Sequence, residues 1–160
     1  MTKPKSLVLF CGGGIMDHGL RDHAEIVGAV DMETYPLLAH RRNHRGVPIY
    51  QGDLSMVPAE TVLERLGIRT LDHIHASPPC APWSQASGGG CKHHDSRLTF
   101  LRVIDYLALT RPRYFTFENV MGLVRRKPGQ YWRPVLRDEV RKLGYKIKEW
   151  TLENVRGTVQ

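Results

Sequence analysis

Short apolar runs recur along this chain, and a segment with helical spacing separates each from the next. A strand followed by a helix, repeated several times, favours a mostly parallel sheet with helices on both faces. The 160 residues are enough for one domain with a real core. The sequence therefore predicts a doubly wound α/β fold. We expect strands near residues 6–10, 26–30, 47–50, 71–76, 114–118 and 145–152, and helices near 17–24, 33–43, 59–66, 96–110 and 131–143.

A proline-bracketed cysteine follows the fourth apolar run. Residues 77–84 read Ser-Pro-Pro-Cys-Ala-Pro-Trp-Ser. Prolines restrict the backbone and cannot continue a helix, so they hold Cys80 on a stiff loop. In an α/β sheet ligands bind beyond the carboxyl ends of the strands, which is where this loop begins. Cys80 is thus a candidate nucleophile, and the alternative is a Pro-Pro turn with a small buried cysteine.

The first apolar run leads directly into a glycine-rich turn at residues 12–14. Glycines let a ligand approach the main chain closely, and the following helix offers its positive N-terminal end. The turn suits a nucleotide-like cofactor, although its spacing is not G-x-G-x-x-G. Asp31 and Asp53 end the second and third runs, and Asp31 stands where an acidic group meets the ribose of a cofactor. Either aspartate alone could be a helix cap or turn residue.

Glu118 follows an aromatic and β-branched run at residues 114–117. We expect that run to be a buried strand, and burial raises the pKa of a carboxyl group. Glu118 is therefore a candidate proton donor. The alternative is an ion pair with Arg125 or Arg126.

In this order the motifs resemble those of the cytosine-C5 DNA methyltransferases, whose fold is the Rossmann-like fold of S-adenosylmethionine-dependent methyltransferases. The resemblance implies that Cys80 adds to carbon 6 of cytosine and that Glu118 protonates nitrogen 3, with the base flipped out of the duplex. It implies S-adenosyl-L-methionine as cofactor, bound by Phe10, Cys11, Gly12, Gly13, Gly14, Asp31, Met32, Asp53, Leu54, Pro78 and Leu98. It places the substrate against Ser77, Pro79, Ser84, Asn119, Val120, Arg125 and Arg126.

The charge balance agrees with a polyanionic partner. The formal net charge is +7, and with the resemblance we expect that partner to be DNA. Three cysteines suit a reducing compartment better than a disulfide scaffold. No apolar run is long enough for a membrane span, and the first is too short for a signal peptide. We expect a cytoplasmic protein of a bacterial or phage-infected cell, or a nuclear one in a eukaryote.

The last nine residues, 152–160, resemble the start of the family's eighth motif. By comparison with the family, the target recognition domain and the C-terminal helix are missing. We therefore expect residues 1–160 to be a single methyltransferase catalytic domain truncated at its C-terminal end, part of a split or truncated enzyme with a complementing chain. The alternatives are a non-catalytic cofactor- or DNA-binding remnant, a regulatory subunit, or a tRNA cytosine-C5 methyltransferase.

The glycine-rich loop at residues 85–94 is interpreted as a lid over the flipped base. Its Cys91, His93 and His94 lack a standard zinc spacing, and we expect no metal. His73 and His75 alternate along a predicted strand, which favours packed or rim residues over ligands.

Overall fold

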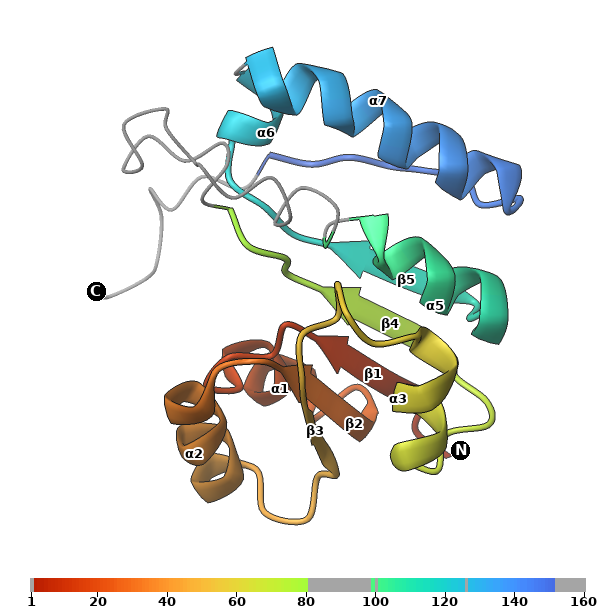
Figure 1. Ribbon diagram of the computed structural model, residues 1–160. Helices are drawn as coiled ribbons and strands as arrows, with labels where there is room; N and C mark the ends of the chain where they lie inside the picture. The colour runs from red at the N-terminus through yellow and green to blue at the C-terminus, as the bar shows by residue number, and fades with distance from the viewer. Residues whose placement is uncertain (1, 81–98, 100, 126, 152–160) are drawn as a thin grey trace.

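The sheet has five strands, all parallel, in the order β3-β2-β1-β4-β5 (Figure 1). The computed structural model describes residues 2–80, 99, 101–125 and 127–151. The strands are β1 (Lys5–Leu9), β2 (Glu25–Asp31), β3 (Ile49–Gln51), β4 (His73–Ala76) and β5 (Tyr114–Phe117). The prediction of a parallel sheet is confirmed, and its order reverses direction between β1 and β4, as in doubly wound folds.

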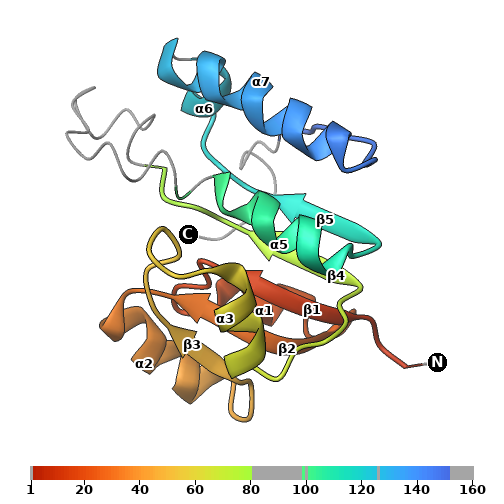
Figure 2. The same cartoon turned by 45° about the vertical axis from the view of Figure 1, so that its right-hand side comes forward.

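Helices cover both faces of the sheet (Figures 1 and 2). On one face, α1 (Ile15–Leu20) and α2 (Thr34–Asn43) pack over a small cluster that includes Val8, Ala29 and Leu37. On the other lie α3 (Ala59–Arg65) and α5 (Val103–Thr110), followed by α6 (Gly122–Arg125) and α7 (Lys127–Lys142). That second face holds the larger core cluster. The β-strands alternate their side chains between these two clusters, as a buried parallel sheet requires.

Helix ends agree with their sequence signals. α5 ends at Arg111, which has a left-handed backbone (φ 45°) and precedes Pro112. α7 ends before Gly144, whose φ of 87° is favourable only for glycine. The apolar side of α7 is in the larger core, where Leu136 and Val140 are buried. Within the described ranges, no helix has the length and apolar character needed to cross a membrane.

The strand expected near residues 145–152 is wrong for the part that the structure describes, which is not paired with the sheet. Side-chain contacts hold this segment instead. The ring of Tyr145 packs edge-on against Phe115 at 5.3 Å, and Glu149 forms an ion pair with Arg133 of α7. The segment is therefore tied to α7 and to the outer side of β5 rather than hydrogen-bonded as a further strand.

Candidate active site

The loops that carry the predicted site residues leave the same edge of the sheet, because parallel strands end together (Figure 1). The loop that carries the candidate nucleophile Cys80, called the nucleophile loop and described from Ser77 to Cys80, follows β4, and Glu118 follows β5, the neighbouring strand. The ladder pairs Ala76 with Phe117, and the backbone N–H of Glu118 donates to the carbonyl of Ala76 at 3.0 Å. The loop after β4 and the segment that carries Glu118 therefore begin side by side, at the same level of the sheet.

The nucleophile loop is held from both neighbouring strands. The backbone N–H of Ser77 donates to the carbonyl of Leu9 in β1 at 3.3 Å. On the other side, the side-chain amide of Asn119 donates to the carbonyl of Pro78 at 3.0 Å. Pro78 is buried, and Cys80 is half-buried against the larger core cluster. The backbone leading to Cys80 is thus clamped between β1 and the segment that carries Glu118.

Glu118 is exposed, so the expectation of a buried carboxyl group is wrong. Its strand, β5, is the last in the sheet, and the two phenylalanines of that strand point into the larger core. The opposite face of β5 presents Tyr114, Thr116 and, one position beyond the strand, Glu118. All three are exposed because α1 and α2 lie over β1 and β2 and do not reach this end of the sheet.

The glycine turn after β1 is tightly coiled. Its φ angles are positive at Phe10 (59°), Gly12 (52°) and Gly14 (88°), a conformation that a bulky residue such as Phe10 adopts only under strain. The turn is closed by a hydrogen bond from the N–H of Gly14 to the carbonyl of Cys11 at 3.0 Å. A side chain added at Gly12 would meet no atom within 4 Å, so a ligand has room to approach the backbone there.

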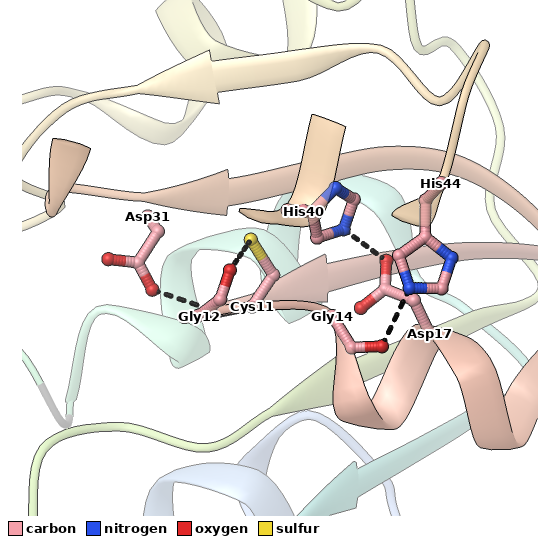
Figure 3. A network of polar contacts seen from close by, with 7 residues as sticks. All are labelled: Cys11, Gly12, Gly14, Asp17, Asp31, His40 and His44. Carbon is pink, nitrogen blue, oxygen red and sulfur yellow. Dashed lines mark hydrogen bonds and ion pairs between the residues drawn. The ribbon is translucent and has the colours of Figure 1, made fainter. Parts of the chain in front are cut away.

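Asp31, the last residue of β2, lies at this turn (Figure 3). One of its carboxylate oxygens accepts the N–H of Gly12 at 2.8 Å, and the other accepts the N–H of Glu33 at 2.9 Å. Hydrogen bonds to an ionised group are stronger than neutral ones, so Asp31 fixes the turn against the end of β2. Met32, next along the chain, is 52% exposed beside it. The binding of a ribose by Asp31 remains a prediction.

A second polar network holds the end of the turn and the start of α1 (Figure 3). His40 donates from Nε2 to Asp17 at 2.9 Å, and both side chains are fully buried. His44 donates from Nε2 to the carbonyl of Gly14 at 2.8 Å. The sequence reasoning missed this network, although His40 in the last turn of α2 and His44, the residue that caps this helix, stand four positions apart.

Cys11 is the other described cysteine, and its environment differs from that of Cys80. Cys11 is buried, and its thiol donates to the carbonyl of Gly12 at 3.7 Å. Burial raises the pKa of the Cys11 thiol far above its ordinary value, and the negative charges of Asp17 and Asp31 add to that effect. Cys11 is therefore held as a neutral thiol, and its cofactor role stays a prediction.

The turn after β3 carries Asp53 and Leu54, and its contacts are those of a structural turn. Leu54 is buried in the larger core. Asp53 accepts both the backbone N–H (2.8 Å) and the hydroxyl (2.7 Å) of Ser55, the arrangement of a turn residue. The cofactor roles of Asp53 and Leu54 stay predictions.

Three of the remaining predicted site residues are exposed, namely Pro79, Val120 and Arg125. Ser84, Leu98 and Arg126 lie outside the described residues, as do the loop at 85–94 and the segment at 152–160. In the described part of the chain, no three metal-ligating side chains come together.

Comparison with known proteins identifies a family that matches this chain. The family model of the C-5 cytosine-specific DNA methylases matches residues 5–156. The chain is 27% identical over 143 residues to Type II methyltransferase M1.HphI of Haemophilus parahaemolyticus, covering 88% of this chain and 38% of that protein. It is 28% identical over 127 residues to the human tRNA (cytosine(38)-C(5))-methyltransferase, covering 76% of this chain and 32% of that protein.

Among solved structures, that of S. pombe Dnmt2 methyltransferase matches with a TM-score of 0.62 and 25% identity, covering 86% of this chain and 41% of that one. The predicted Rossmann-like methyltransferase fold is thereby confirmed. The chain spans 32% to 41% of the length of these proteins.

Proposed function

Because the chain belongs to the C-5 cytosine-specific DNA methylase family, we propose that it forms the catalytic part of a DNA cytosine-C5 methyltransferase. The observation that carries the proposal is the clamp between the two loops, in which Asn119, next to Glu118, donates to the carbonyl of Pro78 in the nucleophile loop. This clamp and the β4–β5 ladder join the segment that leads to Cys80 to the segment that carries Glu118, and a reaction on one base requires these two side chains to converge.

In the proposed reaction the Cys80 thiolate forms a bond to carbon 6 of a flipped cytosine while Glu118 donates a proton to nitrogen 3. Addition at carbon 6 places electron density on carbon 5, where S-adenosyl-L-methionine, when bound, would supply the methyl group and leave as S-adenosylhomocysteine. Loss of the carbon 5 proton to solvent then breaks the bond between carbon 6 and the Cys80 sulfur and releases the thiolate, and nitrogen 3 returns its proton to Glu118. Cys80 thus supplies the nucleophile and Glu118 removes the charge that would otherwise build up on the ring.

The glycine turn fits S-adenosyl-L-methionine as the proposed cofactor. The space over Gly12 is open, and Asp31 fixes the turn from β2. When bound, this cofactor supplies an electrophilic methyl group. The residues proposed to hold it are the backbone of the turn at 10–14 and the side chains of Asp31 and Met32. The exposed position of Met32 is compatible with contact to a cofactor base.

Two further parts of the proposal concern the location of the protein in the cell and the source of target recognition. We place it in the cytoplasm of a bacterial or phage-infected cell, since M1.HphI is a bacterial Type II methyltransferase. Target recognition is proposed to come from outside these residues, on the same or on a complementing polypeptide, because this chain covers only 38% of that relative.

The test uses duplex DNA with 5-fluorocytosine, which blocks loss of the group at carbon 5 and traps the covalent adduct. With S-adenosyl-L-methionine present, we expect an adduct that maps to Cys80 by peptide mass spectrometry. Cys80→Ser should abolish it and keep cofactor binding, since a serine hydroxyl is scarcely ionised at neutral pH. An absent adduct in the parent chain, alone and with a complementing chain, would favour the non-catalytic alternative.

A tRNA substrate is the second candidate, favoured by the human relative that is named for cytosine 38 of tRNA. The net charge of +7 suits either nucleic acid. A tRNA anticodon stem-loop with 5-fluorocytosine, tested beside the DNA duplex, separates the two. Trapping of the RNA alone would overturn the DNA assignment.

A further inference from the structure

A line of hydrogen-bonded side chains crosses three strands and ends at the nucleophile loop. The hydroxyl of Ser6 in β1 bonds Nδ1 of His73 at 2.8 Å, and Nε2 of His73 bonds the Thr116 hydroxyl in β5 at 3.0 Å. The same Thr116 hydroxyl bonds Nδ1 of His75 at 2.7 Å, and Nε2 of His75 bonds the Ser77 hydroxyl at 2.7 Å. Ser77 is three residues before Cys80.

Strand register explains why these residues meet. In the parallel ladder, Ser6 pairs with His73 and His75 pairs with Thr116. Paired residues point to the same face of a sheet, and residues two apart along a strand share that face. The line therefore runs along the face opposite α5, from the start of β4 to its carboxyl end. Its last member, Ser77, lies at the level where Glu118 leaves β5.

His75 is the central member of the half of this line that reaches the loop. It is 2% exposed, and burial lowers the pKa of its ring to about 4, with the neighbouring His73 acting in the same direction. A neutral imidazole has one N–H donor and one acceptor nitrogen. Because the two hydroxyls at its ends each donate and accept, both ring nitrogens are satisfied, and the two bonds together fix the plane of the ring.

We propose that His75 is a positioning residue, which ties the first residue of the nucleophile loop to β5 and thereby sets where Cys80 lies relative to Glu118. The proposal rests on the proposed function for the roles of those two residues. His75 bridges Ser77 and Thr116, which precede Cys80 by three residues and Glu118 by two. It therefore joins the two catalytic segments just below the site, at a level where the Asn119 clamp does not act.

His73 provides a matched control. It lies on the same face of the same strand and makes the same number of side-chain hydrogen bonds, also to two hydroxyls. Burial lowers the pKa of its ring as well. However, its partners are Ser6 and Thr116, so it does not touch the nucleophile loop. Replacing either histidine by phenylalanine removes two hydrogen bonds, but only His75→Phe frees the hydroxyl of Ser77, whose backbone N–H keeps its bond to Leu9.

The first measurement is the rate of adduct formation with 5-fluorocytosine DNA, next to cofactor affinity by calorimetry. Misplacing a reacting group by about 1 Å costs up to roughly a hundredfold in rate, so His75→Phe should slow trapping by about tenfold to a hundredfold. Cofactor affinity should stay unchanged. His75→Gln, whose amide can donate and accept, should restore part of the rate. Equal slowing in His73→Phe and His75→Phe, or no slowing in His75→Phe, would overturn the proposal.

A second measurement needs no methyltransferase activity. Iodoacetamide alkylates Cys80 without DNA, and peptide mass spectrometry resolves it from the other cysteines. We expect faster alkylation of Cys80 in His75→Phe and in Ser77→Ala, because a released loop exposes the thiol, and the parent rate in His73→Phe. Ser77→Ala removes the same bond without disturbing the buried ring. If the parent forms no adduct, either alone or with a complementing chain, the proposed function fails, whereas equal alkylation rates in all these variants refute the role of His75.

Discussion

Acid should destabilise the fold through His75, and the size of the effect follows from its burial. The pKa of this ring falls from an ordinary 6.5 to about 4 on folding. Each unit of difference corresponds to about 1.4 kcal/mol, so protonation opposes folding by roughly 3 kcal/mol. Since the folded state disfavours the proton, the stabilisation is complete above pH 6.5 and is lost as the pH falls toward 4. The lowered pKa of His73 acts in the same direction.

The assay is urea unfolding of the parent and of His75→Phe at a series of pH values from 7.5 down to 4. The parent should lose roughly 3 kcal/mol more unfolding free energy over this range than the variant, because all other titrating groups are common to both. An NMR titration of the His75 ring gives the midpoint directly. Parallel stability curves, or a ring that titrates near 6.5, would refute the account of a buried neutral imidazole.

Three further predictions concern the two loops and the glycine turn. Glu118→Gln should slow adduct formation by about a hundredfold or more in single-turnover trapping, the scale of a lost general acid, and an unchanged rate would remove Glu118 from that role. Asp31→Ala deletes a charge-assisted hydrogen bond to Gly12 and should weaken S-adenosyl-L-methionine binding by about tenfold in calorimetry, whereas unaltered affinity would leave Asp31 a purely structural residue. Gly14→Ala should lower the unfolding free energy by about 1–3 kcal/mol in urea, because φ is 88° and the new Cβ would collide with the ring of His44. Gly46→Ala, with φ at 90° and open space, is its control and should cost less.

The sequence predicts the core of the sheet well because apolar runs and strand ends are local signals. The nearness of Asp31 to the glycine turn follows from parallel strands ending together, and the structure has that contact. The exposure of Glu118 was mispredicted because its run was read as wholly buried. Only Phe115 and Phe117 point inward, and the polar Thr116 between them already marked the other face.

Local sequence patterns do not show which distant segments of the chain pair with one another. Tyr145 and Ile147 alternate with lysines as a half-buried strand would, and both do pack against the larger core. That packing satisfies the pattern without any ladder, so a strand was predicted where the structure has none. The His75–Thr116 bond joins residues 41 positions apart, and only the register of β4 on β5 brings them together.

The order of the strands in the sheet also sets the order in which the groups of the proposed reaction lie. The glycine turn belongs to β1, Cys80 follows β4 and Glu118 follows β5, so donor site, nucleophile and acid stand in sequence along one edge of the sheet. A cytosine ring that meets Cys80 then has the methyl donor on one side and Glu118 on the other. Because β4 is the middle strand of the three, a displacement of its carboxyl end changes both distances at once. A side-chain hydrogen bond at the carboxyl end of β4 therefore has more influence on the geometry than the same bond in β1 or β5. His75 makes such a bond to Ser77 and a second one to Thr116 of β5.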